Sequence, residues 1–380
     1  MKYLIKSDRI VTPDGIADGY IEIEDGYIKN VTKKHEKCDT VYDFTGKYVL
    51  PGFVELHTHG AGGHPFLTDD AAVVARACDH HLSHGTTTIL PTLSASEFDT
   101  MKKGVKAIKE ARDSSLTKAR IIGAHLEGPY LSEKQCGAQC PKHITEPKVA
   151  DYTALVEEYG DAIARWTYAP ERDDGSFAKY LTEHNVIASA GHTDAKGEDM
   201  TRAEENGMKL VTHFYSCMST VTRNMGFRSL GVIESTYLSD ELTVEIIADG
   251  KHLPVDLVKL IIKIKGVDKV IAITDSLEIA GTDIKCGNMA GTDFIVEDGV
   301  CKLLDRSAFA GSVATSDVLL RFLHNECGVS LTDAVKMLSE NPAKMLGINA
   351  GKIDTGCYAD LVVLDDALTV CGVFVGGERV

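Results

Sequence analysis

Apolar, β-rich runs recur along the middle of the 380-residue chain, and a polar or glycine-rich break follows each of them. Most of the runs are separated by amphipathic, helix-like stretches, of which residues 69–85 and 96–115 are the clearest. The eight runs are YVLPGFVELHTH, TTTILPTLS, RIIGAHLEGPY, ARWTYAPE, VIASAGHTDA, KLVTHFYS, TVEIIADGKH and KVIAITDS. Strands that alternate with helices form a parallel sheet, and eight such units predict a (β/α)8 barrel.

Both ends of the chain depart from this alternation. Residues 1–48 contain short strand-like segments joined by turns, and residues 351–380 have the same character. We therefore expect an α/β protein with a TIM-like barrel over residues 49–350 and a small β-sandwich domain built from both termini. Asp360, in the segment ADLVVLD, suits a turn that enters the small domain.

Composition excludes several classes of protein. No apolar stretch approaches the roughly 20 residues of a membrane-spanning helix, and the first residues lack the apolar region of a signal peptide. The formal net charge of −16 argues against nucleic acid as a partner. Ten cysteines without the spacing of a disulfide framework favour a reducing cytoplasm. We thus expect a cytoplasmic protein that binds neither membranes nor nucleic acid, and we further expect it to form a homodimer.

Residues that bind metals or transfer protons stand at the carboxyl ends of the predicted strands, where the active sites of such barrels form. His57 and His59 are one residue apart, so on a strand both side chains point to the same face. A single histidine at a strand end is ordinarily a loop residue. Convergence at the same end of successive strands instead indicates a metal-dependent hydrolase. The other strand-end residues of this kind are Glu127, His192, His213, His252 and Asp275.

A second pattern of metal-ligand types is weaker. Cys136, Cys140 and His143 are types of residue that bind zinc, but their spacing is poor and a fourth ligand is missing. We therefore do not expect a zinc site in this segment.

The motifs of the chain resemble, in the same order, those of the N-acetylglucosamine-6-phosphate deacetylases of the amidohydrolase superfamily. The similarity extends from about residue 50 to residue 365 and includes PGFVELHTHGAGG, HLEGPYL, SAGHTDA, VTHFYSCMS, IADGKHL and SENPAKMLGI. The resemblance implies that Glu127, His192 and His213 form a metal triad. It also implies that His57 and His59 match a pair that supports a second metal in some members.

The resemblance assigns roles to the remaining residues as well. Asp275 matches the catalytic acid and base, and His252 matches a histidine that contacts the substrate. The backbone after His213, at Ser216 and Cys217, matches the segment that holds the sugar phosphate. Because histidine and carboxylate ligands suit several metals, the expected cofactor is one or two divalent ions, either zinc or iron.

Three positions depart from the family's pattern. Residues 214–218 read FYSCM where members commonly have LFNAM. Residues 222–228 read TRNMGFR in place of a HREPG stretch that carries a phosphate-binding arginine. Gln139 stands where the family has a histidine that helps to fix the substrate. We expect Gln139 to contact the substrate, and either Arg223 or Arg228 to bind its phosphate.

The implied reaction is hydrolysis of the acetamide of N-acetylglucosamine 6-phosphate to glucosamine 6-phosphate and acetate. N-acetylgalactosamine 6-phosphate or an unphosphorylated N-acetyl amino sugar are alternative substrates. Another hydrolase of the superfamily is a further alternative, although strand 4 ends in TYAPE and lacks the lysine that binuclear members often carry. A catalytically inactive scaffold is disfavoured, because such proteins lose ligands and this chain retains all of them.

Overall fold

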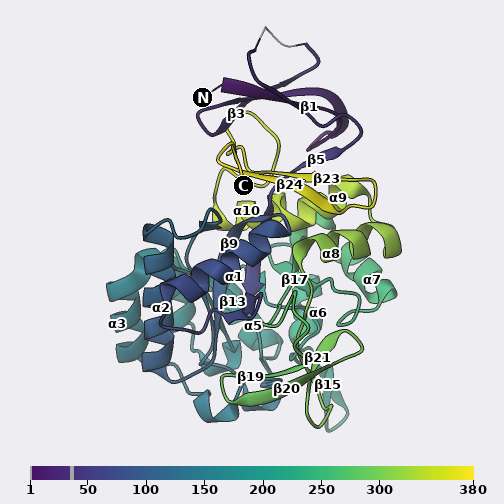
Figure 1. The fold of residues 1–380 in the computed structure, drawn as a ribbon. Helices are drawn as coiled ribbons and strands as arrows, with labels where there is room; N and C mark the ends of the chain where they lie inside the picture. Colours follow the sequence, from purple (N-terminus) through teal and green to yellow (C-terminus); the bar gives the residue numbers. More distant parts are fainter. Residues whose placement is uncertain (1, 35–37) are drawn as a thin grey trace.

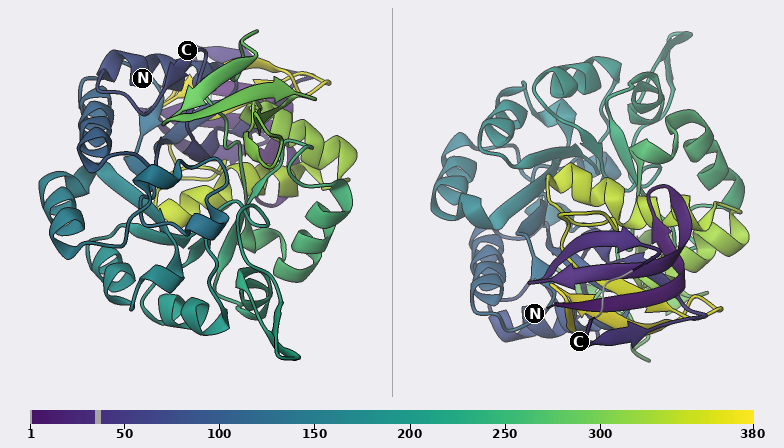
Figure 2. Two further views of the ribbon diagram at one scale, coloured as in Figure 1. Left: turned by 90° about the horizontal axis from the view of Figure 1, so that it is seen from below. Right: turned by 90° about the horizontal axis from the view of Figure 1, so that it is seen from above.

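The computed structural model describes residues 2–34 and 38–380, and its largest sheet is parallel. Helices surround this sheet as a ring, which Figure 2 shows from below in its left view. The hydrogen-bonded order is β10–β9–β11–β12–β13–β14–β17–β18, and β6 pairs with β9, so the predicted (β/α)8 barrel is confirmed. The strands are β6 (Phe53–Thr58), β9 (Thr86–Ser94), β10 (Arg120–Ile121), β11 (Ala124–Glu127), β12 (Ile163–Tyr168), β13 (Ile187–Ala190), β14 (Leu210–Val211), β17 (Thr243–Ile247) and β18 (Val270–Ile273).

The barrel closes between its first and last strands, β6 and β18. The backbone N–H of Asp275 donates to the carbonyl of His57 at 2.9 Å. The carboxylate of Glu55 accepts from the backbone N–H groups of His57 and Thr274, each at 3.0 Å. Closure therefore sets His57 beside Asp275, although His57 and Thr274, the residue before Asp275, are 217 positions apart in the sequence.

Amphipathic helices cover the barrel. The two stretches predicted to be helical contain α1 and α2, and α1 begins after Asp70, whose carboxylate accepts the N–H of Ala72. Within residues 2–34 and 38–380, no helix is long and apolar enough to cross a membrane. The α-helices are α1 (Ala71–Ser83), α2 (Phe98–Asp113), α3 (Val149–Tyr159), α4 (Ser176–Glu183), α5 (Gly197–Glu205), α6 (Val232–Leu238), α7 (Val255–Lys265), α8 (Ser316–Arg321), α9 (Leu331–Leu338) and α10 (Glu340–Leu346).

A second sheet combines both ends of the chain, as expected, and lies against one end of the barrel (Figure 1). Its strand order is β25–β24–β23–β5–β1–β2–β3, and β4 pairs with β1. Side chains from N-terminal and C-terminal strands, such as Ile5, Ile21, Val363 and Phe374, share one apolar core. The strands are β1 (Lys2–Thr12), β2 (Gly15–Glu24), β3 (Tyr27–Thr32), β4 (Val41–Asp43), β5 (Tyr48–Pro51), β23 (Leu361–Leu364), β24 (Val370–Val375) and β25 (Glu378–Arg379).

The first apolar run of the sequence is divided between these two sheets. Its beginning forms β5, which pairs antiparallel with β23, and its end forms β6 of the barrel. Gly52 lies between them, and a Cβ at this position would come within 2.1 Å of the Thr87 hydroxyl. A residue without a side chain thus allows the chain to pass from one sheet to the other in close contact with β9.

Two insertions lie at the end of the barrel opposite the terminal sheet (Figure 1). One is a four-stranded antiparallel sheet between β18 and α8, which the sequence analysis did not anticipate. The other is a short hairpin of β15 (Thr222–Asn224) and β16 (Phe227–Ser229). The four-stranded insertion comprises β19 (Cys286–Met289), β20 (Thr292–Glu297), β21 (Val300–Leu303) and β22 (Phe309–Gly311).

Candidate functional site

A pocket of about 250 Å³ lies at the carboxyl ends of the barrel strands. The inserted sheet contributes Met289 and Phe309 to its wall. His57 does not line the pocket but lies beneath it, fully buried at the end of β6. The predicted site residues that line the pocket are His59, Glu127, Gln139, His192, His213, Ser216, Cys217, His252 and Asp275.

One group of potential metal ligands consists of Glu127, His192 and His213. The Nε2 atoms of the two histidines each lie 3.1 Å from Oε1 of Glu127 and 3.1 Å from each other. All three residues are at most 5% exposed. Glu127 ends β11, and His192 and His213 follow β13 and β14, so the barrel geometry brings together residues that are far apart in the sequence.

A second group consists of His57, His59 and Asp275. The Nε2 atoms of both histidines lie 3.4 Å from Oδ1 of Asp275. Glu127 also faces this group, because its Oε1 is 3.4 Å from Nε2 of His57 and its Oε2 is 3.1 Å from Nε2 of His59. One carboxylate therefore stands between the two groups, in a position to contact a cation in either.

The backbone at several of these residues is strained. His192, His213 and Asp275 have φ angles of 47°, 29° and 47°, a region that residues with a side chain rarely adopt. Tyr215 and Cys217 in the following loop share this property. Such conformations cost roughly 1–3 kcal/mol each and persist only where the surrounding structure imposes them. The side chains are thus held in the pocket at the expense of local backbone energy.

The charges of the cluster are coupled and buried. Burial opposes a charge on His57, but the carboxylates of Glu127 and Asp275 outweigh it and raise the pKa of His57 to about 10. Burial also opposes ionisation of Asp275, yet the imidazoles of His57 and His59 lower the pKa of Asp275 to about 2. The carboxylates are therefore ionised at neutral pH and attract positive charge to the centre of the cluster.

The donor set fits a divalent cation. Nδ1 of His192 lies 2.9 Å from the carbonyl of Gln135, and Nδ1 of His59 lies 2.9 Å from the Ser94 hydroxyl. These outer contacts leave both Nε2 atoms facing the cluster, as in histidines that bind metals. Both ring nitrogens of His57 are buried without a hydrogen bond. Imidazole and carboxylate donors in this arrangement suit zinc or iron.

The remaining pocket residues are positioned by their neighbours. Nδ1 of His252 lies 2.8 Å from the Asp249 carboxylate, which fixes the orientation of the ring. Gln139 donates from Nε2 to Oε2 of Glu127 at 2.6 Å, and its Oε1 accepts the N–H of Ala95 at 2.9 Å. Gln139 therefore contacts a potential metal ligand as well as lining the pocket.

Arg223 and Arg228 do not line this pocket in the structure. They are paired across the β15–β16 hairpin, and both are exposed. Met225 and Phe227 on the same hairpin are 93% and 80% exposed. A role of either arginine in binding phosphate stays a prediction. Cys136, Cys140 and His143 do not form a metal-ligand group within the part of the chain that the structure describes.

The sequence analysis did not single out two charged residues that lie below the cluster. Arg165 in β12 and Glu245 in β17 are both 0% exposed and form an ion pair inside the barrel. Each is the only charged residue of an otherwise apolar or neutral strand. A charge in a buried strand needs a partner of opposite charge. The single charged residue in each of these two strands was therefore a signal that could have been read from the sequence.

Comparisons with known proteins agree with this architecture. The model of the amidohydrolase family matches residues 48–380, and that of the composite domain of allantoinase matches residues 1–44. An N-acetylglucosamine-6-phosphate deacetylase from Bacillus subtilis (strain 168) is 32% identical, with 97% of this chain and 95% of the relative covered. An N-acetylgalactosamine-6-phosphate deacetylase from Shewanella sp. (strain ANA-3) is 30% identical, with 94% and 90% covered.

Solved structures extend the similarity to three dimensions. A mutant N-acetyl-D-glucosamine-6-phosphate deacetylase from Mycobacterium smegmatis, in complex with N-acetyl-D-glucosamine-6-phosphate, superimposes with a TM-score of 0.92 at 28% identity. The match covers 100% of this chain and 99% of that chain. An enamidase at 16% identity, with a TM-score of 0.60, shares the fold. The chain therefore belongs to the amidohydrolase family and, within it, to the N-acetylglucosamine-6-phosphate deacetylases.

Proposed function

We propose that this enzyme hydrolyses the acetamide of N-acetylglucosamine 6-phosphate to glucosamine 6-phosphate and acetate. The observation that carries the proposal is the position of Glu127 between two buried ligand groups, with Asp275 at the same pocket. The full-length similarity to deacetylases of this name supports the choice of substrate.

In the proposed reaction, Asp275 is the residue that moves the proton. A divalent cation, when bound, polarises an amide carbonyl and makes water more acidic. Asp275 accepts the proton of the attacking water and delivers it to the departing amine, which leaves poorly without it. His252, oriented by Asp249, donates a hydrogen bond to the substrate. The burial of Glu127 and Asp275 strengthens the electrostatic interactions in this pocket.

The proposed cofactor is one or two divalent ions, zinc or iron. Glu127, His192 and His213 would hold one ion, and His57 and His59 would hold a second. The proximity of the two groups and the shared carboxylate support this division. The ligand chemistry suits both metals.

The proposed assembly is a cytoplasmic homodimer. The exposed Met225 and Phe227 support an interface at the β15–β16 hairpin, because apolar side chains that protrude together mark contact surfaces.

Arg223 and Arg228 are the proposed phosphate ligands, and their guanidinium groups suit bidentate contact with phosphate oxygens.

A second candidate substrate is N-acetylgalactosamine 6-phosphate. The 30% identical relative from Shewanella carries this name. The pocket also contains Tyr215, Ser216, Cys217 and Gln139 in the segments that depart from the pattern of the glucosamine enzymes.

A substrate panel tests the proposal. We would measure acetate release from N-acetylglucosamine 6-phosphate, N-acetylgalactosamine 6-phosphate and N-acetylglucosamine, with the Asp275→Asn variant as a control for contaminating activity. We expect the highest kcat/KM for the first compound. A higher value for the galactosamine compound selects the alternative, and equal values with and without phosphate contradict recognition of the phosphate.

The two arginines of the hairpin can be tested in the same assay. A charge-assisted hydrogen bond of roughly 1.5–3 kcal/mol corresponds to roughly a ten- to hundredfold change. Arg223→Ala or Arg228→Ala should therefore raise KM for the 6-phosphate sugar by this factor and leave KM for the unphosphorylated sugar unchanged. Arg76→Ala, which removes an exposed arginine of α1, is the matched control. Equal effects on both substrates exclude phosphate binding by the hairpin.

A further inference from the structure

The ion pair of Arg165 and Glu245 occupies the barrel interior directly below the candidate metal centre. Arg165 binds Glu245 through both Nη atoms, and the contact from Nη2 to Oε2 is 2.8 Å. Both side chains are 0% exposed. Burying two opposite charges is costly, and a neutral pair of similar volume often gives equal or greater stability. Folding stability alone therefore does not explain why the barrel contains this ion pair.

All five N–H groups of the Arg165 guanidinium have an acceptor. Besides Glu245, these acceptors are the Leu56 carbonyl at 3.2 Å, the Thr212 hydroxyl at 2.8 Å and the Ser189 hydroxyl at 3.1 Å. Leu56 immediately precedes His57, and Thr212 immediately precedes His213. Arg165 thus contacts the residue that precedes a potential metal ligand in each of the two groups, His57 in one group and His213 in the other.

Glu245 faces the side of His57 that points away from the metal cluster. Its Oε2 lies 3.8 Å from Nδ1 of His57, while Nε2 of the same ring points to Glu127 and Asp275. Nδ1 has no hydrogen-bond partner among the described residues, and the His125 ring packs edge-on against the His57 ring at 4.7 Å. The distance to Glu245 is longer than a hydrogen bond, so a small movement of the ring is needed to form one.

We propose that Glu245 and Arg165 are positioning residues for the metal centre, an inference that rests on the proposed metal-dependent function. Glu245 accepts the Nδ1 proton of His57, which leaves the lone pair of Nε2 for the cation. Arg165 keeps the Glu245 carboxylate in place and neutralises its charge. Outer carboxylates of this kind set both the tautomer and the orientation of metal-binding histidines.

The test separates metal binding from stability. The double variant Arg165→Met/Glu245→Leu removes both charges and leaves neither one unpaired. Glu245→Gln is a milder variant that cannot neutralise Arg165. Asp360→Asn is the matched control, because Asp360 is also a buried carboxylate paired with an arginine, Arg120 at 3.4 Å, but it binds the terminal sheet at the N–H of Gly376. For each protein we would measure Zn²⁺ affinity by chelator competition, the number of bound ions, and the midpoint of thermal unfolding.

We expect the double variant to keep its thermal midpoint and to lose roughly 10- to 100-fold in affinity for the ion at His57 and His59. Glu245→Gln should lose affinity in the same direction, and Asp360→Asn should retain it. Wild-type affinity and ion count in a folded double variant overturn the proposal. If the double variant does not fold, Glu245→Gln decides, and either unfolding or wild-type affinity in that variant assigns the pair to stability alone. If the wild-type protein binds no divalent ion, the proposed function fails first.

Discussion

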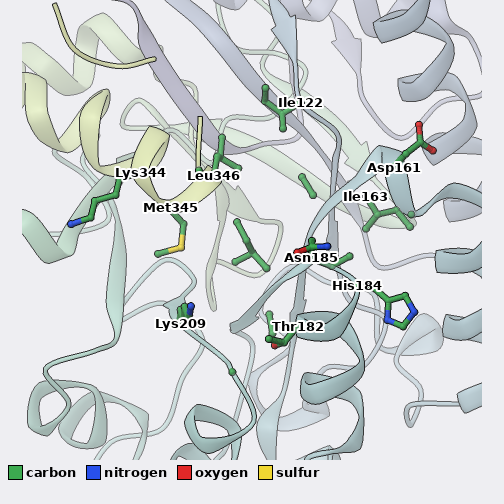
Figure 3. Close-up of a pocket in the computed structure, with 17 residues that line it drawn as sticks. Ile122, Asp161, Ile163, Thr182, His184, Asn185, Lys209, Lys344, Met345 and Leu346 are labelled. Carbon is green, nitrogen blue, oxygen red and sulfur yellow. The ribbon is translucent and has the colours of Figure 1, made fainter. Parts of the chain in front are cut away.

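The two ends of the barrel contain cavities of opposite character. At the amino ends of β12 and β13, a cavity of about 630 Å³ lies between the barrel and the end of α10 (Figure 3). Apolar side chains such as Ile163 and Met345 lie around it, and its charged residues Asp161, Lys209 and Lys344 are exposed. The carboxyl-end pocket is less than half as large, at about 250 Å³, yet its histidines and carboxylates are buried. Burial of converging titratable groups, and not volume, distinguishes the candidate active site.

The charged groups at the two cavities also differ in how strongly they can interact with a cation. Asp161 at the amino-end cavity is exposed and already paired with Lys109 at 2.5 Å and with Arg112 at 2.7 Å. Such surface pairs are screened by solvent and contribute little. At the other end, Glu127 and Asp275 are removed from water and face imidazoles, so a cation there meets strong and fixed ligands.

Removal of the metal should produce the largest effect at the carboxyl end. His192→Ala should lose its bound ion and roughly 1,000-fold or more in kcat/KM, because Lewis acidity is worth several kcal/mol. His57→Ala should lose only the second ion. Elemental analysis and acetate release measure both effects, with the wild-type protein treated with chelator as the reference. Unchanged metal content in His192→Ala would contradict the assignment of the first group.

The proton transfer assigned to Asp275 should give the next largest effect. Asp275→Asn has the same shape but cannot accept and return a proton. We expect kcat to fall by at least ~100-fold, the lower end of general acid–base contributions, while the fold and most of the bound metal are retained. Steady-state kinetics and elemental analysis on the same preparation test this. A kcat within a few-fold of wild type assigns the proton transfer to another group.

Substitutions at the amino-end cavity should have the smallest effect. Lys209→Ala and Lys344→Ala remove exposed side chains from its rim, and exposed substitutions change stability by about 0.5 kcal/mol or less. Neither lysine lines the carboxyl-end pocket, so we expect kcat/KM to stay within about twofold of wild type, or roughly 0.4 kcal/mol of activation free energy. A loss comparable to that of Asp275→Asn would show that the two ends are functionally connected.

Much of the candidate site was predictable because its signals are local. The alternation of β-rich and amphipathic segments identified the barrel, and the strand ends identified His57, Glu127, His192 and His213 as neighbours. The carboxyl ends of parallel strands always meet at one end of a barrel, so position along each strand was sufficient. The division of the chain at residues 48/49 and 350/351 is still a prediction.

The sequence by itself determined the residue types at the strand ends, the helices α1 and α2, and the joining of both termini in one small β domain. Only the tertiary structure decided that β5 leaves the barrel, that the inserted sheet brings Phe309 to the pocket, and that Arg165 meets Glu245 below His57. The reason is physical. Hydrophobic periodicity reports which face of a segment is buried, whereas the pairing of Arg165 with a residue 80 positions away depends on how the closed barrel places its strands.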